Sequence, residues 1–156
     1  MNTDPGAWSL IYCYRTGKFL LGKRSQLVRK PGLWNFFGGH LEPGESPRAA
    51  VLRELGEETG LSPDMAELQP LGIAPFSELG YAAGLREFHY FVLFTERELK
   101  PKLGPEHSLS RWFPATAIPK NMNRPSSVAI EIGLTLKAQQ LALQLGCGER
   151  GDSRAL

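Results

Sequence analysis

The first part of the chain alternates between short apolar runs and turn residues, a pattern typical of strands. Residues 7–15 are rich in Trp, Ile, Tyr and Leu and predict one strand. Thr16-Gly17-Lys18 then turns the chain into a second apolar run at residues 19–22, so the two runs predict a hairpin. After a basic loop, residues 33–37 predict a short aromatic strand, whereas the glycine-rich residues 38–44 predict no regular element.

The pattern becomes helical at Ser46. This serine is a suitable N-cap, Pro47 suits the first helical position, and good helix formers follow. Gly60 predicts the end of the helix, because glycine readily adopts the left-handed conformation found at helix C-termini. We therefore expect a helix that begins at Pro47 and ends just before Gly60.

The second half of the chain repeats both kinds of pattern. Residues 71–76 and 86–95 predict strands, the second being dense in aromatic and β-branched residues. Residues 109–114 predict a further short strand. Residues 126–145 have apolar positions at helical spacing, so they predict one long C-terminal helix that Gly146 ends.

Length and composition favour one ordinary domain. The 156 residues, 42% of them hydrophobic, suffice for a single core, so we expect one domain over residues 1–156 with flexible tails at residues 1–6 and 147–156. The formal charge of +2 is too small for a dedicated nucleic-acid binder. The sequence shows no signal peptide or membrane span, and Cys13 lies far from Cys147, so we expect a cytoplasmic protein with reduced thiols.

Three carboxylates give the chain its clearest candidate chemistry. On the predicted helix, Glu54, Glu57 and Glu58 occupy positions i, i+3 and i+4, which lie on one face. They crowd together near the helix C-terminus, where the helix dipole disfavours anions. An acidic helix face is most often simply solvated, but hard oxygen ligands in this arrangement suit Mg²⁺ or Mn²⁺.

The residues around these carboxylates identify a family. Gly39 is followed after five residues by Glu45 and after seven more by Arg53-Glu54. The pattern continues with an aliphatic residue, any residue and then Glu57-Glu58. It ends with any residue, a glycine and a second aliphatic residue at position 61. Residues 39–61 therefore resemble, at every specified position, the signature of the Nudix (MutT-like) hydrolases. The resemblance implies an α/β fold, with a mixed β-sheet between helices in an α/β/α sandwich.

The same resemblance assigns roles to residues of the signature. It implies metal ligands among Glu54, Glu57, Glu58 and the backbone carbonyl of Gly38 or Gly39, with Mg²⁺ as cofactor and Mn²⁺ as a substitute. It also implies that Glu45 and Arg53 orient these ligands. The catalytic residues that it implies are Glu57, Glu54, Arg53 and a general base. Family members take this base either from the signature or from a later loop, where Glu106 is the candidate and a solvated loop acid is the equal alternative.

Residues outside the signature would choose the substrate. Lys23 and Arg24, with Arg29 and Lys30, form a basic stretch able to hold phosphates, although a solvated basic loop is the commoner interpretation. Trp34 and Phe36 could stack on a base, but aromatic residues on one side of a strand more often belong to a core. His40, inside the glycine loop, is a further candidate for substrate contact. Phe37 stands where the commoner pattern has proline before the two glycines, which weakens transfer of any relative's substrate.

We therefore expect metal-dependent hydrolysis of a diphosphate linkage in a nucleoside diphosphate joined to another moiety, such as a (d)NTP, ADP-ribose or a nucleotide sugar. Capped or triphosphorylated RNA is a less favoured substrate, and no membrane partner is expected. The protein could be a monomer or a homodimer. The alternative is a nucleotide-sensing module that has lost catalysis, although such modules usually lose signature carboxylates and this chain keeps them all. An isomerase acting on a prenyl diphosphate lacks support, because no well-placed cysteine accompanies the signature.

Overall fold

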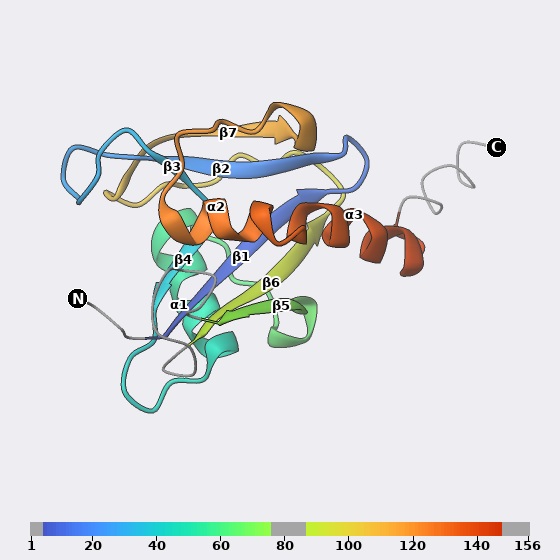
Figure 1. Ribbon diagram of the computed structural model, residues 1–156, viewed down its shortest axis with the longest axis horizontal. Helices are drawn as coiled ribbons and strands as arrows, with labels where there is room; N and C mark the ends of the chain where they lie inside the picture. Colours follow the sequence, from blue (N-terminus) through green and yellow to red (C-terminus); the bar gives the residue numbers. More distant parts are fainter. Residues whose placement is uncertain (1–4, 76–86, 148–156) are drawn as a thin grey trace.

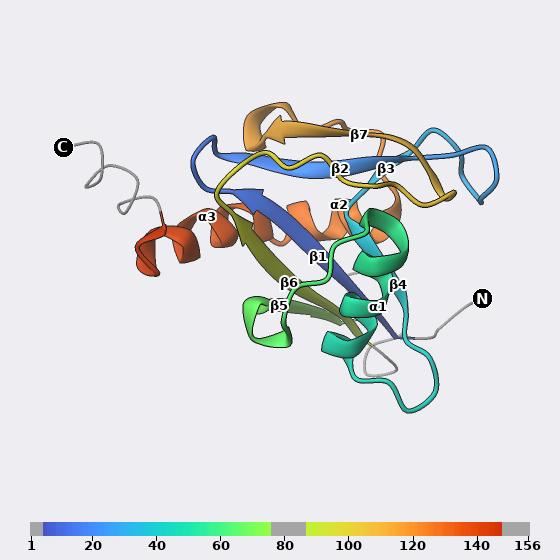
Figure 2. The same cartoon turned by 180° about the vertical axis from the view of Figure 1, so that it is seen from behind.

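The computed structural model describes residues 5–75 and 87–147. A mixed seven-stranded sheet forms the middle layer, with one long helix on one face and two helices on the other (Figures 1 and 2). The strands are β1 (Gly6–Cys13), β2 (Lys18–Arg24), β3 (Trp34–Asn35), β4 (Phe37–His40), β5 (Gln69–Pro75), β6 (Glu87–Thr95) and β7 (His107–Pro114). The helices are α1 (Pro47–Thr59), α2 (Arg124–Glu131) and α3 (Leu134–Gln144), with short 3₁₀ turns η1 (Met65–Glu67) and η2 (Ala115–Ala117).

Strand β1 organises the sheet. Along one edge it pairs in parallel with β6 over its whole length, and β5 follows antiparallel to β6. Along its other edge it pairs with two strands: residues 11–13 pair with β2 and residues 6–9 with β4, both antiparallel. Strand β2 then carries β3 and β7. The predicted mixed-sheet α/β/α sandwich is confirmed.

Alternating side chains of the central strands build a core on each face. On β1, Trp8, Leu10 and Tyr12 pack in the cluster that α2 and α3 cover. Ala7 and Ile11 point the other way, into the cluster that contains Val51 and Leu55 of α1. Both faces of β1 are therefore buried, which explains why its sequence reads as a continuous apolar run rather than as an alternation.

Helix α1 agrees with the sequence at both ends. The Ser46 side chain accepts a hydrogen bond from the backbone N–H of Ala49, Pro47 is the first helical residue, and Gly60 adopts the left-handed conformation with φ of 73°. The predicted hairpin and strands are present as β1, β2, β5, β6 and β7, with shifted ends. Phe76 and Arg86, the predicted ends of two strands, lie outside the described residues.

The glycine-rich segment departs from the expectation of irregular structure. Residues 33–40 form two strands instead of one, and β4 includes Gly38 and Gly39. The reason is a close approach to β1: a Cβ on Gly38 would lie 2.2 Å from the Ala7 carbonyl oxygen and 2.6 Å from the Trp8 Cα. Here the glycines permit a strand pairing that any side chain would block.

The C-terminal segment also differs from the sequence-based prediction, because residues 126–145 form parts of two helices and not one. Gly133 has a φ of 82°, in the left-handed region, and separates α2 from α3. Helix α3 still buries Leu134, Ala138 and Ala142 on the sheet, which accounts for the continuous apolar periodicity. Within residues 5–75 and 87–147, no helix is long and apolar enough to cross a membrane.

A single buried hydroxyl joins α2 to the junction of β3 and β4. The Ser126 Oγ accepts a hydrogen bond of 2.9 Å from the backbone N–H of Phe36, and Ser126 is fully buried. We expect Ser126→Ala to lower the free energy of unfolding by about 1–3 kcal/mol, because it leaves a buried donor unpaired. Urea unfolding measures this change. Ser127→Ala, which removes a neighbouring half-buried hydroxyl, should change stability by less than about 0.5 kcal/mol, and equal losses in both variants would contradict the assignment.

Candidate active site

Arg53 organises the acidic face of α1. Its Nε and Nη2 donate to the two carboxylate oxygens of Glu45 at 2.8 and 2.9 Å, and its Nη1 donates to Glu54 Oε1 at 2.9 Å. Nη2 also reaches the backbone carbonyl of His40 at 3.1 Å. The Arg53 hydrogen bonds, followed by a backbone hydrogen bond, lower the pKa of Glu45 to about 2. Glu45 thus stays ionised, and Arg53 fixes the place of Glu54 against the glycine segment.

Glu54 lies directly against the backbone of β4. A Cβ on Gly39 would be 2.6 Å from Glu54 Oε1, so the carboxylate occupies the space that a side chain at this position would fill. Burial raises the pKa of Glu54, and the charges of Glu57 and Glu106 raise it further against the opposing effect of Arg53. Two more anions are therefore close enough to act on this carboxylate.

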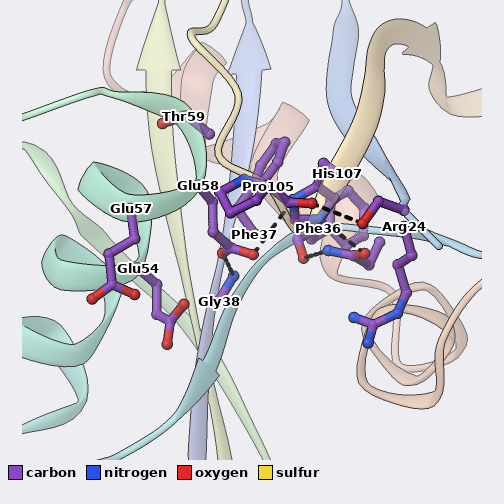
Figure 3. Close-up of polar contacts among 12 residues, drawn as sticks. Arg24, Phe36, Phe37, Gly38, Glu54, Glu57, Glu58, Thr59, Pro105 and His107 are labelled. Carbon is purple, nitrogen blue, oxygen red and sulfur yellow. Dashed lines mark hydrogen bonds and ion pairs between the residues drawn. The ribbon is translucent and has the colours of Figure 1, made fainter. Parts of the chain in front are cut away.

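Glu58 turns away from its two neighbours and into the protein. Its Oε1 accepts a hydrogen bond of 2.8 Å from the backbone N–H of Gly38, and its Oε2 is 3.7 Å from Nδ1 of His107 (Figure 3). The side chain is only 5% exposed. Burial, and then the charge of Glu54, raise the pKa of Glu58 well above its usual range. Burial, and then the charge of Arg24, lower the pKa of His107 to about 4.

The segment that precedes β7 carries Glu106 to the same place. The backbone N–H groups of Lys102 and Gly104 donate to the carbonyls of Thr59 and Glu58 at the end of α1. At the other end of the segment, the N–H of Ser25 donates to the Glu106 carbonyl at 2.8 Å. These backbone bonds hold residues 102–106 between α1 and β2, so Glu106 faces the signature carboxylates although it is far from them in the sequence.

An open cleft of about 630 Å³ lies in front of these groups. Its acidic lining residues include Glu54, Glu57 and Glu106, and its basic lining residues include Arg24, Arg29, Lys30 and Arg124. Figure 3 shows Glu54 and Glu57 on one side of Gly38 and Arg24 on the other. The remaining lining residues are Trp8, Asn35, Gly38, Gly39, His40, Leu41, Glu42, Pro43, Arg53, Asn123 and Pro125.

Most residues predicted for the site meet at this cleft. Predicted and found in its lining are Arg24, Gly38, Gly39, His40, Arg53, Glu54, Glu57 and Glu106. Glu58 adjoins a smaller cavity with Glu57 and Glu106 instead. The assigned roles of these residues stay predictions.

Three predicted substrate contacts do not agree with the structure. Phe36 is fully buried in the core beneath α2, where no substrate can stack on it. Trp34 is 7% exposed and packs edge-on against Phe113 with ring centres 5.0 Å apart. Both are therefore core aromatics, the commoner outcome for one-sided aromatic strands. Lys23 lies on β2 between β3 and β7 and is not among the residues that line the cleft.

Other lining residues carry no sequence signal that predicts a place in the site. Trp8 lies in the first strand, and only the pairing of β1 with β4 brings it to the cleft. Asn35 follows Trp34 on a strand whose partners the sequence does not reveal. Arg124 was missed because the predicted C-terminal helix began two residues too late, at residue 126, whereas Asn123 caps the real helix.

The acidic residues fit a divalent metal ion by their chemistry, although they do not converge on one point. Among the described residues, no three His, Cys, Asp or Glu side chains are close enough to hold an ion as they stand. Arg53 draws Glu54 to one side, and the Gly38 N–H draws Glu58 to the other. The mutual raising of carboxylate pKa values shows anions whose repulsion a bound cation would relieve. The hard oxygen donors suit Mg²⁺ or Mn²⁺.

Comparisons with known proteins agree with this architecture. The model of the NUDIX domain family matches residues 4–131. An RNA pyrophosphohydrolase of Roseobacter denitrificans is 30% identical over 120 residues, which cover 68% of this chain and 74% of that protein. A CTP pyrophosphohydrolase of Escherichia coli is 47% identical over 53 residues, and that match covers 34% of this chain but only 39% of that protein. A MutT/nudix family structure from Enterococcus faecalis superposes with a TM-score of 0.67 at 20% identity, covering 92% of this chain and 63% of the other.

The buried carboxylate of Glu58 predicts a pH-dependent change in stability. Its folded-state pKa lies above the unfolded value near 4.5, so the folded protein loses stability as pH rises from 4.5 through the folded pKa. Glu58→Gln removes this loss and keeps an acceptor for the Gly38 N–H. We expect the stability advantage of this variant over the natural protein to grow as pH rises.

Urea unfolding with EDTA, from about pH 5 to about pH 8, measures this difference. Glu57→Gln is the matched control, because the side chain of Glu57 is 59% exposed on the same helix and should show no such growth. A constant difference between Glu58→Gln and the natural protein over this pH range would contradict the prediction.

Proposed function

Because this chain belongs to the NUDIX domain family, we propose that it hydrolyses a diphosphate linkage in a nucleoside diphosphate joined to another moiety. One observation carries the proposal: carboxylates of α1 line a single cleft together with arginine and lysine side chains. A diphosphate is kinetically inert largely because its oxygens repel a nucleophile, so cleavage needs charge neutralisation and a positioned base. This cleft offers groups of both kinds.

Glu54, Glu57 and Glu58, with the backbone carbonyl of Gly38 or Gly39, would hold Mg²⁺, and Mn²⁺ could substitute for it. A divalent ion bound there neutralises phosphate charge and acidifies water. Arg53 does not need to touch the substrate, because its hydrogen bonds to Glu45 and Glu54 already position the carboxylate beside Gly39.

The basic side of the cleft would bind the phosphates. Arg24, Arg29, Lys30 and Arg124 can each donate to phosphate oxygens, and the arginines can do so with two parallel hydrogen bonds. Glu106, also in the cleft lining, would accept the proton of the attacking water, with Glu57 as the alternative base.

The substrate itself is to be found by experiment. We propose a (d)NTP, ADP-ribose or a nucleotide sugar, and the names of two relatives, a CTP pyrophosphohydrolase and an RNA pyrophosphohydrolase, support testing CTP and RNA as well. A panel of these compounds and dinucleoside polyphosphates, assayed with Mg²⁺ and with Mn²⁺ and analysed for products, tests the proposal. Tight nucleotide binding without turnover across the panel would instead favour a nucleotide-sensing module.

The exposed carboxylate of Glu57 should be essential. We expect Glu57→Gln to lower kcat by roughly 10³-fold or more, because it removes a charged ligand from the site that neutralises the phosphates. Steady-state kinetics in saturating Mg²⁺ measure this loss. Glu98→Gln, which changes an exposed glutamate whose nearest cation, Lys18, is 3.9 Å away, is the control and should retain kcat. Full turnover of Glu57→Gln would refute the assignment.

The role of Glu106 can be separated from that of the metal ligands. If Glu106 is the base, Glu106→Gln should lower kcat by roughly 10²- to 10⁴-fold while KM and the Mg²⁺ dependence stay within a few-fold of the natural values. The kinetic constants and the Mg²⁺ activation curve are the measurements. A loss of kcat below about 3-fold would indicate that Glu57, not Glu106, is the base. A changed Mg²⁺ dependence would indicate that Glu106 is a metal ligand.

A further inference from the structure

We propose that Asn35 and His107 are positioning residues that leave one oxygen of Glu58 without a protein hydrogen bond, so that this oxygen can bind the metal ion. The proposal rests on the proposed function, because it takes Glu58 as a metal ligand. It gives a role to two buried side chains, Asn35 in the cleft lining and His107 beside it, that belong to no part of the family signature.

The first observation is an unpartnered polar atom. The His107 side chain is 0% exposed, and its Nδ1 has no hydrogen-bond partner within the described part of the chain. Buried polar atoms in folded proteins are nearly always paired, so an unpaired one requires an explanation. This atom faces Glu58 Oε2 across 3.7 Å, too far for a hydrogen bond between them.

The second observation fixes which ring nitrogen of His107 carries the proton. The Asn35 amide group donates through Nδ2 to the Phe36 carbonyl at 2.6 Å, which turns its Oδ1 toward His107 Nε2 at 3.2 Å. An amide oxygen can only accept, so Nε2 must donate. In the neutral ring, Nδ1 is then a bare acceptor. The side chain is 0% exposed, and burying a charged imidazolium away from water is costly, so the neutral form is favoured.

The consequence falls on Glu58. Its Oε1 is held by the Gly38 N–H at 2.8 Å, and Oε2 meets a lone pair instead of a proton. A donor at Nδ1 would bond Oε2 and compete with a cation for it. A bare acceptor leaves Oε2 open, so one oxygen anchors the side chain and the other is available to an ion.

Packing around the His107 ring fixes its position. Its centre lies 5.1 Å from that of Phe37, and a Cβ on Gly22 would lie 2.6 Å from its Cδ2. His107 thus fills a fixed slot between β2 and β4. A half-turn of the ring would put Cε1 in the place of Nε2 and break the bond to Asn35.

The direct test is ¹⁵N NMR of histidine-labelled protein at neutral pH, with EDTA and then with Mg²⁺, which needs no substrate. The His107 signals are identified by their loss in His107→Phe. We expect a protonated Nε2 and an unprotonated Nδ1 in both conditions. A proton on Nδ1 in the natural protein would overturn the proposal, whatever activity the enzyme has.

The second test removes the group that selects the tautomer. Asn35→Leu should allow a proton on Nδ1 and should weaken Mn²⁺ binding, followed by electron paramagnetic resonance without substrate, by about 10-fold or more. Asn121→Leu is the matched control, because Asn121 is exposed, donates its amide to Gly32 and should leave Mn²⁺ binding unchanged. Unchanged tautomer and Mn²⁺ affinity in folded Asn35→Leu would overturn the proposal. If the proposed hydrolysis fails while these results hold, only the substrate assignment fails.

Discussion

The backbone of β4 passes between β1 and helix α1 with no room for a side chain at either of its glycines. A Cβ on Gly38 would collide with the Ala7 carbonyl, and one on Gly39 would collide with the Glu54 carboxylate. Because neighbouring atoms fill the space on both sides of this backbone, the two glycines can pair with β1 in the sheet while the N–H of Gly38 donates to Glu58. The close approach that completes the sheet is therefore also what places the acidic helix face against backbone polar groups.

This placement is costly for the folded chain. Glu54 and Glu58 are both largely buried, and burial raises the pKa of each carboxyl group. The charges of neighbouring carboxylates raise both pKa values further. A sequence selected for stability alone would replace such groups with apolar or neutral side chains. Arg53 offsets part of the repulsion around Glu45 and Glu54, but it forms no ion pair with Glu58, whose Oε1 accepts a hydrogen bond from the Gly38 N–H. A bound cation would relieve the remaining repulsion, which links these buried carboxylates to their proposed use.

Local signals in the sequence were enough to predict helix α1, because its cap, its first-turn proline and its terminal glycine act within a few residues. The predictions failed where distant segments decide. Gly38 and Gly39 read as loop residues, since only β1 lying beside them shows that they form a strand. Trp34 and Phe36 resembled a stacking surface until α2 and β7 were placed over them. Asn35, His107 and Arg124 carry no local signal at all, and they become site residues through the order of the strands.

The two sides of the cleft are also built differently. The acidic side lies on α1 and on a segment that backbone hydrogen bonds join to α1 and β2. Much of the basic side lies in the loop between β2 and β3, which closes on itself when Arg24 donates through Nε to the Arg29 carbonyl at 2.8 Å. Lys30 in this loop has a φ of 53°, an uncommon conformation for a residue with a side chain. Helix α1 thus holds the carboxylates proposed as metal ligands, whereas Arg29 and Lys30 lie in a loop, so a change of this loop can alter phosphate or substrate binding without disturbing those carboxylates.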